Sequence, residues 1–297
     1  MSKRTLAFLA AIGATTIYGI NHTIAKGVMP TYVTPFAFIF LRVVGAALLF
    51  WAISFLGPKE TIEKKDWVRL VAAALLGMVI NMLSFFKGLE LSTPINSSVL
   101  VTISPIIVVL LSVFFLKERI TINKGLGIAL GCIGALGLVL FGEEIREDAP
   151  NIPLGNSLFL LNATAYGAYL IVAKKLVEKY HPFTLMKWLF TIALMINFPI
   201  TVGDFLLIEW STMPLWAYGV VAFVVLGTTF CTYLFNIFAM TELKASTIGA
   251  FIYVQPLFGI IFALITGKDT LTVVKILSAT LVLLGVYLAS RRVRAKV

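Results

Sequence analysis

The chain has 297 residues, of which 60% are apolar and 13% are charged, and its mean hydropathy is +0.99. A soluble domain has about 45–50% apolar and about 25% charged residues, so this composition excludes an ordinary soluble protein and indicates an integral membrane protein. The net charge of +10 does not indicate nucleic-acid binding, because the Lys and Arg residues lie between apolar segments rather than in one patch.

The apolar segments predict an all-α protein with ten membrane-spanning helices, since a crossing needs about 20 apolar residues. Their ranges are 6–27, 34–56, 67–87, 94–116, 123–142, 153–176, 182–203, 214–238, 245–266 and 271–290. The first span follows Lys3 and Arg4, as a signal peptide would. Its apolar run is longer than the about 7–15 residues of a signal peptide, so we expect a retained helix.

The positions of the basic residues predict the orientation. If the N-terminus lies inside, eighteen of the 24 Lys and Arg residues fall on the cytoplasmic side, five fall on the outer side, and Arg42 lies within the second span. By the positive-inside rule, both termini are expected in the cytoplasm of a bacterial inner-membrane protein. The acidic segment 143–152 is then an external linker between the halves 1–142 and 153–297.

Residues 89–120 and 240–271 repeat one pattern at a shift of 151 residues: an apolar run, a proline near its middle and a charged end. The matched pairs are Asn96 and Thr247, Thr102 and Tyr253, Ser104-Pro105 and Gln255-Pro256, and Lys117-Glu118 and Lys268-Asp269. Five spans in each half is an odd number, so the second half must insert upside down relative to the first. The sequence therefore predicts two inverted five-helix repeats.

The two matched prolines are candidate kink or gating positions. Pro105 and Pro256 each remove a backbone N–H and free the carbonyl four residues earlier, on Val101 and Ile252. Freed carbonyls are tolerated in a membrane where other helices or a water-filled cavity supply partners. Interrupted helices in corresponding places of two halves point to a substrate site near the bilayer midplane. The alternative is a packing kink, since proline is common in membrane helices.

Uncharged polar and aromatic side chains share one face of several spans. The candidate substrate-binding residues are Thr15, Tyr18, His22, Asn81, Ser84, Phe85, Asn96, Thr102, Asn162, Tyr166, Tyr169, Thr229, Tyr233, Asn236, Tyr253 and Gln255. Polar faces are costly against lipid and are expected to face inward. Such a lining suits a neutral or zwitterionic amphipathic solute, because a strongly anionic one would need several Arg or Lys. The alternative is hydrogen bonding between helices, at about 0.6 kcal/mol per pair.

Several chargeable groups lie in or beside the spans. Arg42 is interpreted as a structural residue that reaches or pairs near the outer interface, and Lys26 as an interfacial anchor. Lys87 and Glu90 lie one turn apart and either pair with each other or present Lys87 to a substrate carboxylate. His22 either titrates near neutral pH and gates transport or is a structural hydrogen-bonding residue.

None of the 14 carboxylates lies in the middle of a predicted span. Proton relays and cation sites usually need such groups. We therefore expect a uniporter or exchanger driven by the solute gradient, with proton coupling through His22 as the alternative. Cys132 and Cys231 lie in apolar runs without metal-ligand spacing, so neither a metal, a disulfide nor a cofactor is expected.

Several motifs resemble the EamA repeat of the drug/metabolite transporter superfamily. They are FFKGLELSTPINSSVLVTISPI, LKERIT and GIALGCIGALGLVL, with Tyr18-Gly19, Pro35 and Arg42, and, in the second half, YVQP at 253–256 and GVYLAS. Tyr18 stands where the family usually has Trp. The resemblance implies a ten-helix carrier whose central cavity is lined by spans 1, 3, 4, 6, 8 and 9. It also implies that spans 5 and 10 are peripheral, with glycines that serve packing.

The expected function is alternating-access transport, outward, of a small amphipathic metabolite such as an amino acid, with the lipid bilayer as the other partner and no enzymatic activity. Within the superfamily, the alternative is an antiporter of an anionic nucleotide sugar, disfavoured because an intramembrane basic cluster is missing. A membrane-embedded enzyme would need convergent catalytic groups, whereas His22 and His181 are predicted on opposite sides. A channel would need rings of carbonyls or charges, and a structural subunit would not respond to a ligand.

Overall fold

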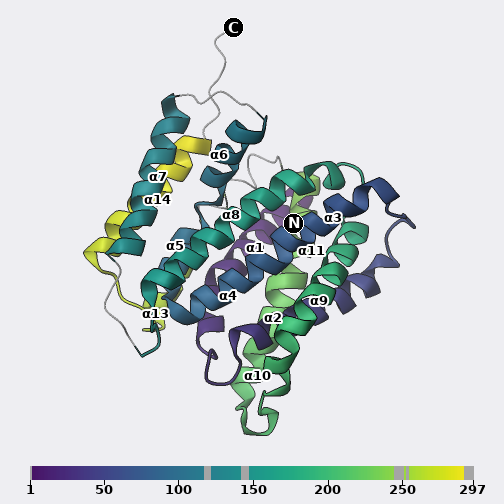
Figure 1. Ribbon diagram of the computed structural model, residues 1–297, viewed down its shortest axis with the longest axis horizontal. Helices are drawn as coiled ribbons and strands as arrows, with labels where there is room; N and C mark the ends of the chain where they lie inside the picture. The colour runs from purple at the N-terminus through teal and green to yellow at the C-terminus, as the bar shows by residue number, and fades with distance from the viewer. Residues whose placement is uncertain (1, 117–121, 142–146, 244–250, 252–253, 291–297) are drawn as a thin grey trace.

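The structure is a computed structural model that describes residues 2–116, 122–141, 147–243, 251 and 254–290. These residues form helices joined by short turns (Figure 1). The first half contains α1 (Lys3–Lys26), α2 (Pro35–Ser54), η1 (Lys64–Asp66), α3 (Trp67–Ala74), η2 (Leu75–Ile80), α4 (Asn81–Leu91), α5 (Pro94–Val101), α6 (Ser104–Leu116) and α7 (Ile122–Leu140). Here η1 is a short 3₁₀ turn and η2 is a π-helical segment.

The second half begins with the longest helices of the structure. It contains α8 (Ile152–Val177), α9 (Pro182–Leu206), the 3₁₀ turn η3 (Trp210–Thr212), α10 (Leu215–Ala222), the π-helical segment η4 (Phe223–Cys231), α11 (Thr232–Glu242), α13 (Gln255–Ile265) and α14 (Val273–Ser290). In each half, consecutive pieces continue one another: η1 to α4 form one long helical unit, and α10 to α11 form another.

Seven helices of the described ranges are long and apolar enough to cross a membrane. They are Pro35–Ser54, Lys64–Leu91, Pro94–Leu111, Ile122–Leu140, Ile152–Val177, Pro182–Leu206 and Leu215–Asn236, and two shorter apolar helices, Gln255–Ile265 and Val273–Leu288, accompany them. The prediction of an all-α integral membrane protein is therefore confirmed. Each range predicted as a span overlaps a helix of the structure.

Several helices begin where the sequence places a capping residue before a proline. Thr34 and Thr93 have extended backbones, and their side-chain oxygens accept hydrogen bonds from Ala37 N–H and Asn96 N–H. A proline follows each of them at the first helical position, where its missing N–H is not needed. These local signals fix the starts of α2 and α5.

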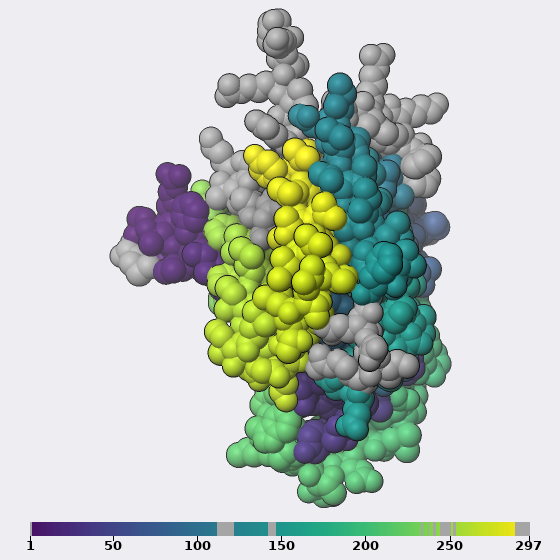
Figure 2. Space-filling model, turned by 90° about the vertical axis from the view of Figure 1, so that its left-hand side faces the viewer, coloured from purple at the N-terminus to yellow at the C-terminus, as the bar shows by residue number. Residues whose placement is uncertain are grey.

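The closest helix pairs join one half of the chain to the other. They are α7 with α14, α2 with α9, α1 with α11 and α4 with α8. Figures 1 and 2 show α14, in yellow, lying along the teal α7 at one side of the molecule. Glycines permit this approach, because a Cβ at Gly285 would lie 2.5 Å from the backbone nitrogen of Gly131. The packing role expected for the glycines of these two helices is thus present in the structure.

Candidate functional site

The helix that contains Pro105 is interrupted where the sequence predicted. α5 ends at Val101 and α6 begins at Ser104, and between them Ile103 N–H bonds only three residues back, to Leu100. The carbonyl of Val101 accepts a hydrogen bond from the Ser104 hydroxyl at 2.8 Å. The freed carbonyl therefore has a partner next to the proline itself. In the second half, α13 begins at residues 255–256, and Ile252 and Tyr253 lie outside the described residues.

Two π-helical segments lie at corresponding positions of the two halves, and the sequence reading missed both. Residue 81 donates its backbone N–H to the carbonyl of Leu76, and Thr232 donates to Gly227, so each bond spans five residues. The segments end directly before Asn81 and Thr232, which are 151 residues apart. π-Helical turns are rare and are frequent at functional sites. The only sequence signal was a glycine inside each apolar run.

Directly after these segments, polar side chains join the helices of one half to those of the other. Asn81 Nδ2 donates to the carbonyl of Asn162 at 3.2 Å, and Asn162 Nδ2 donates to the carbonyl of Asn81 at 2.8 Å. At the corresponding crossing, the hydroxyl oxygens of Tyr18 and Thr232 lie 3.0 Å apart. These two connections link α4 with α8 and α1 with α11 at the same level of the chain repeat.

Tyr166 and Tyr169 lie on α8 beside the first of these connections. Their ring centroids are 5.9 Å apart. Tyr169 is buried against η2, where a Cβ at Gly77 would lie 2.5 Å from its Cδ2. Tyr166 remains 41% exposed beside Tyr169. The two predicted tyrosines of α8 are therefore neighbours, whereas Tyr18 of α1 contacts Thr232 of α11.

His22 is buried and contacts two other elements. Its Nδ1 lies 2.6 Å from Ser97 Oγ on α5, and its ring packs edge-on against Phe85 of α4 at 5.3 Å. Ser97 was not among the predicted site residues. Because the Ser97 hydroxyl and the His22 imidazole are hydrogen-bonded to each other, and the imidazole packs on Phe85, His22 connects α1, α4 and α5 in this conformation.

Asn96 takes part in a polar network at the start of α5. Its Nδ2 lies 3.3 Å from Asn156 Oδ1, which also accepts from Ser92 Oγ at 2.6 Å. Asn156 in turn donates to the carbonyl of Leu138 at 2.6 Å. The Oδ1 of Asn96 is buried and has no hydrogen-bond partner among the described residues. Asn96 thus serves helix packing with one side-chain atom and leaves the other available.

Other predicted residues use their polar groups within their own helices. The hydroxyls of Thr15, Ser84 and Thr102 donate to the carbonyls of Ala11, Ile80 and Val99. Such back-bonding satisfies a hydroxyl within its own helix, and of the three only Ser84 also reaches the carbonyl of Asn81, at 3.3 Å. Asn236 and Gln255 are partly buried on α11 and α13, and Pro256 is buried at the start of α13. Tyr233 has its backbone in α11, while its side chain and the whole of Tyr253 lie outside the described residues.

Arg42 reaches inward from α2 and is not directed only to the outer interface. Its Nε donates to Thr229 Oγ1 at 2.9 Å, and its Cζ lies 5.9 Å from the centroid of the Phe86 ring. A guanidinium over an aromatic face is stabilised by the ring quadrupole. Arg42 therefore joins α2 to η4 and α4, which agrees with the structural role that we expected.

Two lysines near the C-terminal ends of α1 and α4 differ from each other in their surroundings. Lys26 is buried and donates to the carbonyls of Leu89 at 2.7 Å and Glu90 at 2.8 Å, so it caps the C-terminus of α4 and is not an exposed interfacial anchor. Lys87 forms an ion pair with Glu90, as one of its two predicted roles required. The pairing satisfies the Lys87 ammonium in this conformation.

A buried ion pair lies in the turn between α13 and α14. Asp269 Oδ1 accepts from Lys275 Nζ at 2.7 Å, and Asp269 Oδ2 accepts from the Ile95 N–H of α5 at 3.0 Å. A carboxylate at a helix N-terminus is favoured by the free N–H groups and by the helix dipole. The second half of the chain thereby fixes the start of the interrupted helix in the first half.

Helices that cross a membrane and enclose uncharged polar side chains define a multi-pass membrane protein with a polar interior. Residues 5–140 and 153–291 each match the family described as the EamA-like transporter family, and the chain belongs to that family. The two matched segments confirm the resemblance of both halves to the EamA repeat, and membership places the chain among transport proteins rather than enzymes.

The chain is similar over most of its length to other transporters. One from Archaeoglobus fulgidus, named uncharacterized transporter, is 28% identical over 284 residues, covering 93% of this chain and 96% of the relative. The uncharacterized transporter YyaM of Bacillus subtilis is 23% identical and covers 80% of this chain and 78% of its own. A crystal structure with 17% identity covers 96% of both chains at a TM-score of 0.60, which shows the same fold.

Proposed function

We propose that this protein is a secondary transporter that moves a small neutral or zwitterionic amphipathic solute, with an amino acid as the first candidate, outward by alternating access. The observation that carries the proposal is the cluster formed by Asn81, Asn162, Tyr166 and Tyr169 where α4 and α8 meet, with Tyr18 of α1 at the corresponding crossing with α11. Its groups are uncharged hydrogen-bonding partners beside aromatic rings, which suit a solute with both polar and apolar parts.

Equivalent contacts in the two halves support the ten-span architecture of inverted repeats, with the units 1–142 and 153–297 on either side of the linker. A Cβ at Gly19 would lie 2.8 Å from Phe258, and a Cβ at Gly167 would lie 3.0 Å from Ile107. Gly167 follows Gly19 by 148 residues, and Phe258 follows Ile107 by 151. The π-helical segments repeat at the same spacing. Matching contacts at matching positions are expected when a duplicated unit packs around a two-fold axis.

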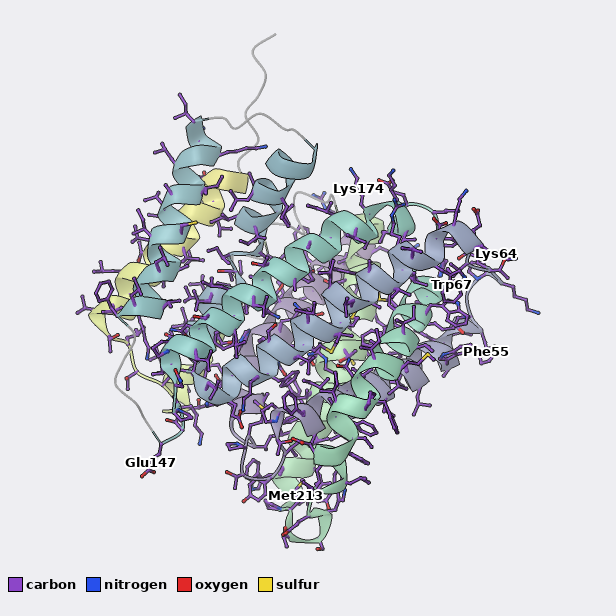
Figure 3. All side chains as sticks on the ribbon, viewed as in Figure 1. Phe55, Lys64, Trp67, Glu147, Lys174 and Met213 are labelled. Atoms are coloured by element: carbon purple, nitrogen blue, oxygen red, sulfur yellow. The ribbon has the colours of Figure 1, made fainter. Side chains whose placement is uncertain are left out.

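The distribution of charged side chains supports termini that both lie in the cytoplasm of a plasma-membrane protein. Figure 3 shows Lys64 and Lys174 toward the upper right of the molecule and Glu147 and Met213 at its lower edge. Lysines at one end and an acidic loop at the other follow the positive-inside pattern. The upper end would then face the cytoplasm.

Alternating access would use the interrupted helices and the contacts at their ends. Asp269 and Lys275 hold the start of α5 and so close the side of the molecule to which Glu147 belongs. Pro105, after the break at residues 102–103, allows α5 and α6 to move separately, and Pro256 would do so in the other half. Release of the Asp269 contact would open the outer side.

The test is counterflow in liposomes preloaded with one unlabelled amino acid at a time, scoring entry of the labelled compound over empty liposomes. Asn81→Ala and Tyr166→Ala should abolish the exchange that the unaltered protein supports. Ser157→Ala is the matched control, because Ser157 is exposed on α8 and bonds only its own helix, to Pro153. If the folded protein exchanges none of the twenty amino acids, amino acids are rejected as its solutes. Exchange that survives Asn81→Ala and Tyr166→Ala would reject the site.

A further inference from the structure

A few buried polar atoms have no hydrogen-bond partner in the described residues. They belong to Asn21, Thr23, Asn96 and Asn197. A buried acceptor without a partner is costly, because it has lost water and gained nothing in exchange. Asn21 is 4% exposed and its Oδ1 is such an acceptor. This oxygen is a buried acceptor to which no described residue donates a hydrogen bond.

Asn21 lies on α1 among residues of the candidate site. It is three residues after Tyr18, whose hydroxyl meets Thr232, and it directly precedes His22, which contacts Ser97 and Phe85. Residues three apart on a helix are neighbours on its surface. Asn21 therefore lies on α1 between the contact of Tyr18 with the second half and the contacts of His22 with α4 and α5.

The repeat assigns Asn21 a counterpart in the second half. At the spacing of 148 residues that relates Tyr18 to Tyr166, Asn21 corresponds to Tyr169. Tyr169 packs over Gly77 of η2, where a Cβ would lie 2.7 Å from the Cγ of its ring. Gly77 itself corresponds to Thr228 of η4, which is fully buried and donates its hydroxyl to Val224. One half thus carries a large aromatic ring where the other carries a short amide.

We propose that Asn21 binds the solute: its Oδ1 accepts a hydrogen bond from an ammonium or hydroxyl group, while the Tyr169 ring, positioned by Gly77, contacts the apolar part. The inference rests on the proposed function and goes beyond it by fixing one orientation of the solute in the site. The two halves provide unlike groups at equivalent places, so a solute with one donor and one apolar end fits in a single direction.

The first test compares three probes in counterflow: L-leucine, with an ammonium donor, 2-hydroxy-4-methylpentanoate, with a hydroxyl donor, and 4-methylpentanoate, with neither. Asn21→Leu keeps the branched shape of the side chain and removes the acceptor. It should raise the half-saturation concentration of a donor-bearing probe about tenfold, which is about 1.4 kcal/mol, and leave that of 4-methylpentanoate unchanged. Asn21→Asp should retain exchange of the ammonium probe and weaken that of the hydroxyl probe, which identifies the donor.

Asn197→Leu is the matched control, because Asn197 is 1% exposed, both its amide atoms lack partners, and it lies on α9, outside the candidate site. It should leave all three half-saturation concentrations unchanged. Equal effects of Asn21→Leu on all probes, no effect on any, or the same effect from Asn197→Leu would overturn the role of Asn21.

A second test needs no solute. In a background with Cys132→Ser and Cys231→Ser, the variants Asn21→Cys and Asn197→Cys are reconstituted and treated with a small water-soluble methanethiosulfonate. Asn21→Cys should be modified several-fold faster than Asn197→Cys, because a binding residue must be reached from water during the cycle. If the protein exchanges none of the probes, the proposed amino-acid transport is rejected, but the rate of thiol modification still tests the role of Asn21. A folded Asn21→Cys protein that resists modification overturns the inference.

Discussion

The buried ion pair between Asp269 and Lys275 provides the sharpest stability prediction. Asp269→Asn removes the charge while keeping an oxygen that can accept from Ile95 N–H. The carboxylate lies 2.7 Å from the Lys275 ammonium, and the two side chains are 0% and 3% exposed. The substitution therefore removes the carboxylate charge that lies beside a buried ammonium.

Breaking a buried ion pair by removing one partner costs about 3–5 kcal/mol, because the remaining charge stays out of water. For a chain of this size, 1 kcal/mol corresponds to a shift of about 2–4 °C in the unfolding temperature. The expected decrease for Asp269→Asn is therefore on the order of 10 °C. Adding Lys275→Met to the same protein removes the buried ammonium charge and should restore most of the decrease in unfolding temperature.

The measurement is the thermal unfolding midpoint of the purified proteins in one detergent at neutral pH. Lys65→Gln is the control, because Lys65 pairs with Glu63 at 2.8 Å but its side chain is 75% exposed. Exposed pairs contribute little, so this variant should unfold with the unaltered protein. An Asp269→Asn midpoint no lower than that of Lys65→Gln, or a double variant less stable than the single one, would refute the reasoning.

Three further predictions concern pH, glycine packing and the interrupted helix. Hydrogen bonding to Lys179 holds the pKa of Glu63 below its ordinary 4.5. The Glu63 carboxylate therefore stabilises the folded protein above pH 4.5, and this stabilisation is lost as the pH falls through the lower pKa of the folded state. Glu63→Gln should make the unfolding temperature depend less on pH in the acidic range. Gly285→Ala should destabilise by about 1–3 kcal/mol through overpacking, whereas Gly203→Ala, with open space around it, should not; equal unfolding midpoints would contradict this. Ser104→Ala should cost about 1–3 kcal/mol by leaving a carbonyl unpaired, measured against Thr266→Ala, an exposed back-bonded hydroxyl.

Local signals in the sequence were sufficient for the helices and for the break at Pro105. A proline removes its own N–H wherever it stands, so the interruption follows from one residue and its neighbours. The capping threonines before Pro35 and Pro94 act in the same local way. What the sequence did not indicate is that Ser104, rather than another helix, satisfies the freed carbonyl.

Partners far apart in the chain were not predictable from spacing. Lys26 was expected at the membrane surface, yet it binds carbonyls 63 and 64 residues away because α1 packs beside the end of α4. His22 was recognised as a polar residue of the site, but its partner Ser97 is 75 residues distant. Such pairs depend on how helices cross, which no periodicity within one helix encodes.

The sequence by itself determined that this is a duplicated, all-helical membrane protein with uncharged polar faces, because the bilayer demands apolar runs of fixed length and a repeat is visible as residue order. Only the tertiary structure decided which polar atoms are already satisfied, and so separated Thr15 and Thr102 from Asn81 and Asn162. It also revealed the π-helical segments, where one extra residue in a turn changes the direction of the side chains without changing the composition of the run.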